Sequence, residues 1–385
     1  MNILLVANYE PDRQISMKRF ADAVAQGLRA RGHKVMTVAP HATVLPRIPR
    51  QSGVGKWLGY IDKYLIFPAR LRRAARTADA VLICDHSNAM YAAAVRPRPH
   101  LVTCHDVIAI RAARGLEDGW HVRLTGRLLQ SWILRSLIGA QHVACVSDHT
   151  RRQLVELAPQ VVGRTSIVYN GLNFDFHPSE RSTADRTVAR YAIGDAPYFI
   201  HVGSGLARKN RVHVVRTFRA MRELRPTLPH RLVFVGAGLD GDVQAEVSAL
   251  GLEPQVIGLG NVENDQLRDL YTSATALIFP SLSEGFGWPV IEAQACGCPA
   301  FVSDRPPMTE IGGDAAIAID VVDPVAAARS ILAALDGLPA HRASSISNAD
   351  RYSADAMIEG YASLLERLVL ARAAGAHALR APADA

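Results

Sequence analysis

The chain has 385 residues, and at about 100–200 residues per domain this length predicts two domains, each large enough to bury its own core. Hydrophobic residues make up 49% of the chain and charged residues 21%, which is typical of a globular protein, and no uncharged apolar run reaches the ~18 residues that a bilayer span needs. Residues 1–172 hold 24 Lys and Arg against 11 Asp and Glu, a net charge of +13, whereas the remainder carries −6, so we expect an anionic partner for the first half.

The N-terminal residues and the cysteines both indicate a cytoplasmic protein. The chain begins MNILLVANY, a strand pattern without the basic region, long apolar region and cleavage site of a signal peptide. The five cysteines are odd in number and lie mostly inside apolar runs, which argues against a disulfide framework. Cys296 and Cys298 form a C-x-C pair with no second ligand pair at metal-binding spacing, so we interpret them as small core side chains.

In the first half of the chain, short apolar runs alternate with helical patterns. A helix is predicted over about 17–31, ending at Gly32, and another over Thr150–Leu157, capped by Ser147. The predicted strands of this half are Asn2–Ala7, Lys34–Val38, Ala80–Cys84, Leu101–Thr103, His142–Val146 and Ser166–Val168.

The same alternation returns in the second half. Residues 173–197 contain few large apolar side chains and are predicted to link domains 1–172 and 198–353, and a last helix over about 354–373 is expected to pack back on the first domain. The predicted strands are Tyr198–Val202, Leu232–Val235, Val256–Leu259, Ala276–Phe279, Ala300–Val302 and Ala316–Ile319. Repeated strand–helix units predict an α/β protein with two Rossmann-like domains facing a central cleft, and ligands at the carboxyl ends of the strands.

The segment SLSEGFGWPVIE (281–292) carries two glutamates eight positions apart, directly after a predicted strand. Its glycines let a ligand approach the backbone, and the proline suits a first helical turn, whose open N–H groups attract a phosphate. Glu292, just inside the helix, can accept hydrogen bonds from two ribose hydroxyls, and Glu284 can reach sugar hydroxyls beyond the phosphate. An ordinary connection with surface glutamates explains one of them, but not both together with the glycine turn.

The segment GSGLARKN (203–210) also follows a predicted strand and starts a glycine turn at Gly203. Arg208 and Lys209 would place two cations at the carboxyl end of that strand. A diphosphate leaving group needs such neutralisation as its charge grows. Alone, the segment would also be compatible with a basic solvated loop.

Two further segments carry weaker signals. His105 and Asp106 stand at the end of a first-domain strand and suit hydrogen bonding to a substrate, although a structural histidine explains them as well. GAGLDG (236–241) matches G-x-G-x-x-G, but a dinucleotide fold places that motif after the first strand of its domain. We interpret it as a turn near the nucleotide rather than as a nicotinamide site.

Taken together, these segments resemble glycosyltransferase family 4, whose hallmark is the E-x7-E motif, here Glu284 and Glu292. The similar stretches are TCHD (103–106), VSDHT (146–150), VYNG (168–171), VGS to RKN (202–210), LVFVGAG (232–238), QLRDLY (266–271) and FPSLSEGFGWPVIEA (279–293). The resemblance implies the two-domain GT-B fold and a retaining, metal-independent hexosyltransferase that uses a nucleotide-sugar. Its favoured mechanism is a front-face return, in which the leaving phosphate takes the acceptor proton. The His-Asp and Arg-Lys-Asn forms resemble mannosyltransferases, which favours GDP-mannose.

The resemblance also implies roles for residues of the second domain. Glu292 would hold the ribose hydroxyls. Glu284 would contact the transferred sugar, with the backbone N–H groups of Phe286 and Gly287 close by. Lys209 and Arg208 would bind the diphosphate next to Gly203.

In the first domain, His105 would contact the sugar, and the chain departs from the family at the first glycine loop. Many members carry a glycine pair there, whereas this chain has YEPDRQISM (9–17), where Ser16 is the candidate substitute for binding the donor. Many members also have arginine directly after the glycine at 203, where this chain has Ser204. The phosphate contacts would then rest on Arg208 and Lys209.

The first domain is expected to bind a glycan or a polyprenyl-diphosphate-linked acceptor, as in surface polysaccharide or glycolipid biosynthesis. Residues 47–76 alternate basic and apolar side chains, so they could form an amphipathic surface on the anionic inner face of a membrane, or a solvated basic helix. The basic and apolar residues meant are Arg47, Arg50, Lys56, Lys63, Arg70, Arg72, Arg73 and Arg76, with Trp57, Leu58, Tyr60, Tyr64, Leu65, Ile66 and Phe67.

Two other functions compete with this interpretation. A sugar-nucleotide epimerase or a phosphorylase on the same fold would also need a nucleotide or phosphate site. A nucleic-acid-binding module would explain the basic first half but not the two glutamates, so no nucleic-acid partner is expected.

Overall fold

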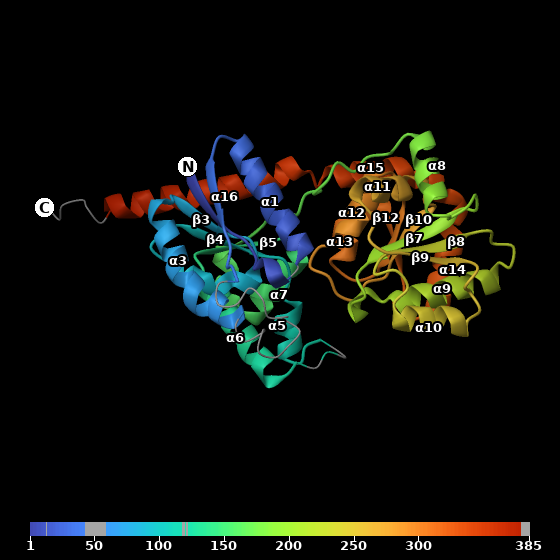
Figure 1. Cartoon of the computed structure of the whole chain (residues 1–385), viewed down its shortest axis with the longest axis horizontal. Helices are drawn as coiled ribbons and strands as arrows, with labels where there is room; N and C mark the ends of the chain where they lie inside the picture. The colour runs from blue at the N-terminus through green and yellow to red at the C-terminus, as the bar shows by residue number, and fades with distance from the viewer. Residues whose placement is uncertain (13, 43–58, 118–119, 121, 379–385) are drawn as a thin grey trace, which may run out of the picture. The chain divides into compact units, whose positions relative to one another are not determined.

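The computed structural model describes the chain except residues 13, 43–58, 118–119, 121 and 379–385 (Figure 1). It divides into two compact units, one of Met1–Asn173 with Ala354–Ala385 and the other of Phe174–Ser353. Each unit is built around its own six-stranded parallel sheet, so the α/β class with two Rossmann-like domains is confirmed.

The first unit has the strand order β2-β1-β3-β4-β5-β6. Its strands are β1 Asn2–Val6, β2 Lys34–Val38, β3 Ala80–Ile83, β4 His100–Cys104, β5 His142–Cys145 and β6 Thr165–Ile167. Its helices are α1 Ile15–Ala30, α3 Phe67–Ala74, α4 Ala92–Val95, α5 Ile108–Ala113, α6 Leu124–Gly139, α7 Asp148–Leu157 and α16 Ala354–Ala378, with the short turns η1 Glu10–Asp12, η2 Asp62–Ile66, η3 Ala75–Thr77, η4 His86–Tyr91 and η5 Pro159–Arg164.

The second unit has the strand order β12-β11-β10-β7-β8-β9. Its strands are β7 Tyr198–Gly203, β8 Arg231–Gly236, β9 Val256–Leu259, β10 Ala276–Phe279, β11 Ala300–Ser303 and β12 Ala316–Ile319. Its helices are α8 Arg181–Arg190, α9 Arg211–Leu224, α10 Gly241–Ala249, α11 Asn264–Ser273, α12 Trp288–Ala295, α13 Met308–Gly312, α14 Pro324–Ala334 and α15 His341–Asp350, with the short turns η6 Ala207–Lys209, η7 Gly313–Ala315 and η8 Leu335–Ala340.

Helices cover both faces of each sheet, which explains why most of the inner strands are apolar runs (Figure 1). In the first unit α1 and α16 lie on one face, and α3, α4 and α6 lie on the other. In the second unit α9, α10 and α14 cover one face, and α11, α12 and α13 cover the other. Apolar residues of neighbouring strands are paired in register: Val202 pairs with Val235, and Phe279 pairs with Val302.

The local predictions hold at several helix ends. Ser147 caps α7 and accepts a hydrogen bond from the Thr150 N–H at 3.1 Å. Gly32 ends the turn after α1 with a left-handed φ of 81°. α16 packs on the first unit, where Tyr361 contacts Phe20 edge to face with 5.8 Å between ring centroids.

Residues 173–197 differ from the expected linker. They include α8, which packs on α11, and they belong to the second unit from Phe174 onward. Small and polar groups contribute to this packing, since Ala184 is fully buried and the Thr187 hydroxyl donates to Asp269 Oδ2 at 2.6 Å. The few large apolar residues contribute as well, because Ile193 is buried and Phe176 meets Tyr271 of α11 edge to face. A segment with few large apolar residues can therefore still be packed when its partners are supplied by another helix.

Candidate functional site

Two loops of the second unit meet where its strand order reverses. β7 and β10 are neighbours at the centre of the sheet, and the chain continues from β7 to β8 and β9 on one side and from β10 to β11 and β12 on the other. The loops after β7 and β10 therefore diverge at the carboxyl edge, the usual ligand position in such sheets. These loops carry the segments 203–210 and 281–287.

The backbone of these two loops is tied together. The Leu282 N–H donates to the Arg208 carbonyl oxygen at 2.8 Å, and Arg208 Nη1 donates to the Ser283 carbonyl oxygen at 2.9 Å. Gly203 and Gly236 lie side by side at the ends of β7 and β8, where a Cβ on Gly236 would stand 2.6 Å from the Gly203 carbonyl oxygen. A glycine at 236 is therefore required for this close approach.

Arg208, Lys209 and Glu284 form an ion cluster between the two loops. Lys209 Nζ donates to Glu284 Oε1 at 2.6 Å, and Arg208 Nη1 donates to Oε2 at 2.5 Å. Lys209 is 8% exposed and Glu284 is 7% exposed. Burial alone would raise the pKa of Glu284, but the two cations outweigh it, so this pKa is lowered. Glu284 is therefore a carboxylate at neutral pH, and two cations to one carboxylate leave an excess of positive charge for an anion.

α12 starts directly after this cluster. Gly287 precedes the helix with a left-handed φ of 106°, and a Cβ there would lie 2.5 Å from Met308 Cε. Pro289 is the second residue of the helix, where its missing N–H has no helical partner to lose. Phe286 is buried beside this start and packs edge to face on Trp288. A helix start of this kind can bind an anion through its N–H groups and dipole.

Glu292 lies in the second turn of α12. Its side chain is 9% exposed, and Oε2 accepts a hydrogen bond from the Tyr271 hydroxyl at 3.4 Å. Both glutamates of the E-x7-E motif are thus more than nine-tenths buried, in one unit and on either side of the same helix start. Tyr271 was not singled out from the sequence, because its contact with Glu292 joins two helices.

His201 and Ser281 are further polar residues that sequence reasoning missed. The His201 ring is fully buried, and its Nδ1 donates to the Ile278 carbonyl oxygen at 2.8 Å. Burial lowers the pKa of His201 to about 3, so the ring is neutral beside the ion cluster. His201 Nε2 and Ser281 Oγ are buried without a hydrogen-bond partner in the part of the chain that the structure describes. The sequence feature that could have revealed His201 is its position inside an otherwise apolar strand, two residues before the glycine turn at Gly203.

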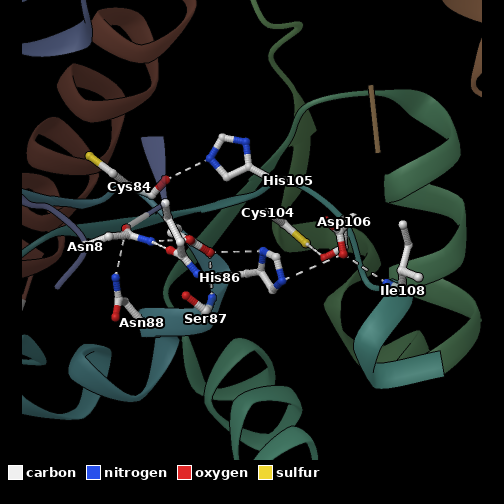
Figure 2. A network of polar contacts seen from close by, with 11 residues as sticks. Asn8, Cys84, His86, Ser87, Asn88, Cys104, His105, Asp106 and Ile108 are labelled. Atoms are coloured by element: carbon white, nitrogen blue, oxygen red, sulfur yellow. Dashed lines mark hydrogen bonds and ion pairs between the residues drawn. The ribbon is translucent and has the colours of Figure 1, made fainter. Parts of the chain in front are cut away.

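The first unit carries its own polar cluster where its strand order reverses, between β1 and β3. Figure 2 shows Asn8, which follows β1, close to Asn88, and His105 pointing at Cys84. Asn8 Nδ2 donates to Asp85 Oδ2 at 2.5 Å and also to the Gln14 side chain, and Asn88 Nδ2 donates to Asn8 Oδ1 at 3.0 Å. Like the loops after β7 and β10 in the second unit, these residues lie at the carboxyl edge of a parallel sheet.

His105 is held firmly within this cluster. Its Nε2 lies 2.9 Å from the Cys84 carbonyl oxygen, and since a carbonyl only accepts, Nε2 carries the hydrogen. The ring also meets Phe20 edge to face with 4.7 Å between centroids. Burial lowers the pKa of His105, so the imidazole is neutral at pH 7. Asp106 turns away from His105: its carboxylate accepts from the Ile108 N–H at 3.1 Å (Figure 2).

Asp85 and His86 were not predicted. Asp85 is 3% exposed, and its Oδ1 accepts from the Ser87 N–H at 2.8 Å and lies 3.3 Å from His86 Nδ1. Burial would raise the pKa of Asp85, but His86, His105 and the hydrogen bonds that it accepts outweigh burial, so this pKa is lowered. The sequence feature that could have revealed them is the Asp-His pair one residue after the end of β3. It is similar to the His-Asp pair that follows β4.

Ser16 is the second residue of α1, and its side chain is exposed. No side chain caps this helix in the part of the chain that the structure describes. The start of α1 therefore differs from a glycine loop, as the sequence indicated. Cys296 and Cys298 are both buried, and no group of three or more His, Cys, Asp or Glu side chains stands at metal-binding distance among the described residues.

Two family models and several proteins are similar to this chain. A model described as "Glycosyltransferase Family 4" matches residues 17–176, and one described as "Glycosyl transferases group 1" matches residues 185–351. O-antigen chain mannosyltransferase B of Escherichia coli is 25% identical over 295 residues, which are 74% of this chain and 75% of that protein. O-antigen chain mannosyltransferase RfbU of Salmonella typhimurium is 26% identical over 185 residues, 48% of each chain.

Solved structures with the same fold cover nearly the whole chain. HepE from Anabaena, solved with UDP and glucose, has a TM-score of 0.75 and 14% identity over 95% of this chain and 99% of that one. WaaG, a glycosyltransferase involved in lipopolysaccharide biosynthesis, has a TM-score of 0.71 and 17% identity over 95% and 99%. Two matching family models in the expected order and a shared fold leave one assignment: the chain is a glycosyltransferase of family 4 with the GT-B fold.

Proposed function

We propose that this enzyme transfers a hexose, with mannose favoured, from a nucleotide-sugar to a glycan or polyprenyl-diphosphate-linked acceptor, with retention of configuration. The observation that carries the proposal is the buried Arg208–Lys209–Glu284 cluster beside the start of α12. Mannose is favoured because the similar O-antigen enzymes are mannosyltransferases. Those relatives also point to a polysaccharide as the product.

In this proposal the donor binds along the carboxyl edge of the second sheet. Glu292 accepts hydrogen bonds from the two ribose hydroxyls. The diphosphate lies between the two cations and the backbone N–H groups at Phe286 and Gly287, and Gly203 gives it room. Glu284 faces the transferred sugar while it holds Lys209 and Arg208 in place. These roles suit the charges: the hydroxyls meet a carboxylate, and the diphosphate meets the excess of cations.

The transfer step then needs no protein nucleophile. The bond between the sugar C1 and the diphosphate oxygen breaks, and its electron pair stays on that oxygen. The acceptor hydroxyl oxygen bonds to C1 on the same face, and its proton passes to the leaving diphosphate. Lys209 and Arg208 stabilise the charge that grows on the leaving group, which is where a preorganised cation lowers the barrier most.

A nucleotide-sugar panel tests this function. A thermal-shift screen against GDP-, UDP-, dTDP- and ADP-sugars is expected to give its largest rise in Tm with GDP-mannose. A ligand at 100 times its Kd stabilises a protein by about 2.7 kcal/mol, or roughly 2–4 °C for a chain with two domains. If no nucleotide-sugar shifts the wild-type Tm, the proposed donor site is wrong; a larger shift with a UDP-sugar would refute only the mannose assignment.

We assign His105 to the transfer step rather than to nucleotide binding. His105→Ala is expected to lower kcat about 10²-fold and to leave the Kd of the free nucleotide within about twofold, because the neutral imidazole contacts the sugar. His142→Ala, at the amino end of β5, is the matched control. A glycosyl-transfer assay measures kcat, and calorimetric titration measures the Kd of the nucleotide. An equal loss in both would contradict this role.

An anionic membrane surface is the second partner that we propose. Exposed apolar side chains line up on one side of α6 at helical spacing and continue onto η2. This apolar stripe consists of Ile61, Leu65, Leu124, Leu128 and Trp132, which are 38–72% exposed. Trp132 meets Tyr64 edge to face at 5.0 Å, which joins the two elements. Arg127 and Arg135 are exposed on the same helix and Arg123 directly before it, a combination that suits anionic lipid.

Only some of the residues predicted to form the amphipathic surface over 47–76 are exposed in the described part of the chain. Residues 47, 50 and 56–58 lie outside the described residues. Phe67 is buried against Tyr91 with 4.9 Å between ring centroids, so it belongs to the core rather than to a surface. Lys63 is bound to Asp12 at 2.6 Å. Arg70, Arg72, Arg73 and Arg76 are exposed, as an amphipathic surface requires.

Vesicle sedimentation at ~0.15 M salt tests the membrane surface. The wild type is expected to pellet with phosphatidylglycerol vesicles and to stay in the supernatant with phosphatidylcholine vesicles. Leu124→Ser with Leu128→Ser should abolish pelleting, whereas Val322→Ser, which changes an apolar side chain exposed on the second unit, should not. Equal pelleting with both vesicle types, or none with either, would eliminate this partner. None of the helices in the described part of the chain is long and apolar enough to cross a bilayer.

A further inference from the structure

The second unit contains a cavity at the edge of its sheet opposite to the ion cluster. The cavity measures about 570 Å³, within the range of small-molecule sites. It is lined by residues that directly precede four strands: Pro197 before β7, His230 before β8, Thr275 before β10 and Pro299 before β11. Because all the strands are parallel, these residues mark the amino edge of the sheet.

The cavity is therefore separate from the proposed donor site. β8 has six residues, and at ~3.3 Å per residue its two ends lie roughly 20 Å apart. His230 precedes the first end, and Gly236, beside Gly203, stands at the other. A ligand in the cavity would not touch Lys209, Glu284 or Glu292, none of which lines it.

His230 is a buried polar residue with one ring nitrogen, Nδ1, that is unpaired within the described residues. It is 8% exposed, and its ring stacks on Phe199 with 4.7 Å between centroids and 20° between planes. Nδ1 is fully buried and has no hydrogen-bond partner among the residues that the structure describes. Burial, assisted by Arg225, lowers the pKa of His230 to about 4, so the ring is neutral at pH 7 and can both donate and accept. Buried polar atoms are paired in the great majority of cases, so an unpaired one needs an explanation.

Two arginines in the same cavity have donors to spare. Arg342 makes no hydrogen bond or ion pair with any residue in the described ranges of the chain, although each guanidinium has five N–H donors. Arg225 makes only long contacts: Nη2 to the Leu332 carbonyl oxygen at 3.4 Å, and Nη1 to Asp336 Oδ1 at 4.0 Å. Arginine forks of this kind match the oxygens of a phosphate.

Most of the remaining lining is apolar, and its polar members are Thr227, Thr275 and Asp336. Leu228 and Leu338 are buried beside it, and four prolines are among its lining residues. The four are Pro197, Pro229, Pro299 and Pro339. Apolar ring faces of this kind suit the C–H face of a sugar, whose hydroxyls would reach Thr275 and Asp336 at the margin.

We propose that this cavity is a second ligand site, which takes a small phosphorylated sugar with its phosphate on Arg225 and Arg342 and its ring beside His230. The bound phosphate replaces the contacts that the two guanidinium groups lack within the described chain. The His230 ring, held by its stacking on Phe199, forms part of the cavity wall beside the sugar. Since the site shares no residue with the donor site, both ligands bind at the same time.

Titration calorimetry with glucose 6-phosphate on the full chain tests the proposal. We expect one saturable site in the wild type, with glucose itself at least tenfold weaker because it lacks the phosphate. Arg342→Ala should lower the affinity for glucose 6-phosphate at least tenfold, and His230→Phe, which keeps the stacking on Phe199, should also weaken it. Arg329→Ala, which removes an exposed arginine of α14 outside the cavity, should bind as the wild type does.

A further variant separates this site from the donor site. Glu284→Gln should leave glucose 6-phosphate binding unchanged, whether or not the proposed glycosyl transfer is correct. Absence of binding to the wild type, full binding to Arg342→Ala, or binding that disappears in Glu284→Gln would each overturn the proposal. Inorganic phosphate that binds as tightly as glucose 6-phosphate would also overturn it, because the sugar ring would then contribute nothing.

Discussion

Lys209→Ala is expected to lower turnover by about 10²- to 10³-fold while the KM of the donor changes far less. The ammonium group of Lys209 is fixed by Glu284 at 2.6 Å and by the face of Phe279, so it is oriented before the reaction begins. Negative charge on the leaving diphosphate grows in the transition state, and a preorganised cation stabilises that charge more than it stabilises the bound substrate. Such a change lowers kcat and kcat/KM together.

Two further measurements keep this result interpretable. Lys34→Ala, which changes an exposed lysine of β2, is expected to leave kcat and KM at wild-type values. The Tm of Lys209→Ala should be measured as well, because the change removes one of the two cations that pair with a buried carboxylate. A variant that keeps its fold and its kcat but raises the donor KM would show that Lys209 binds the donor without assisting the departure of the leaving group.

The strands could be predicted from the sequence because each is defined by the apolar character of its own consecutive residues. A parallel strand covered by helices on both faces must be apolar along its length, and runs such as Ala276–Phe279 and Val256–Leu259 have no polar alternation. All twelve predicted strands are present, each within one residue of its expected bounds at either end. Capping is equally local, which is why the start of α7 at Ser147 was predicted correctly.

The pairings within the sites were not available from the sequence, because they depend on strand order. Lys209 and Glu284 are 75 positions apart, and they meet only because β10 lies directly beside β7. Asn8 and Asp85, 77 positions apart, meet for the same reason at the ends of β1 and β3. Sequence spacing assigns each group to the end of some strand, but it does not say which strand ends are neighbours.

The largest difference between expectation and structure is the linker predicted over 173–197, and it has a related cause. A low apolar content predicts a loosely packed segment, whereas the hydroxyls of Ser179, just before α8, and of Thr187, within it, both donate to Asp269. Asp269 is 4% exposed, and its two oxygens accept one hydrogen bond each from these hydroxyls. A buried carboxylate that organises a neighbouring segment leaves no periodic signal in that segment, so only the three-dimensional contacts show it.

Glu292→Ala is expected to weaken donor binding at least 100-fold. The proposed bonds from two ribose hydroxyls to one carboxylate are charge-assisted, and each is worth about 1.5–3 kcal/mol. Glu292 is buried in the second turn of α12, so no bulk water replaces its oxygens freely after the change. Calorimetric titration of the nucleotide measures the loss directly, without dependence on the acceptor.

A modified donor nucleotide shows whether the loss comes from the ribose. The wild type should bind the 2′-deoxyribose form of the nucleotide at least tenfold more weakly than the ribose form, whereas Glu292→Ala should bind both forms equally, because the partner of the hydroxyl is gone. Tyr271→Phe is the matched control: it removes the 3.4 Å hydrogen bond to Glu292 but keeps the carboxylate, so it should still prefer ribose. If Glu292→Ala kept the wild-type preference for ribose over deoxyribose, its carboxylate would not be the group that holds these hydroxyls, and the role proposed for the second glutamate of the motif would have to be given up.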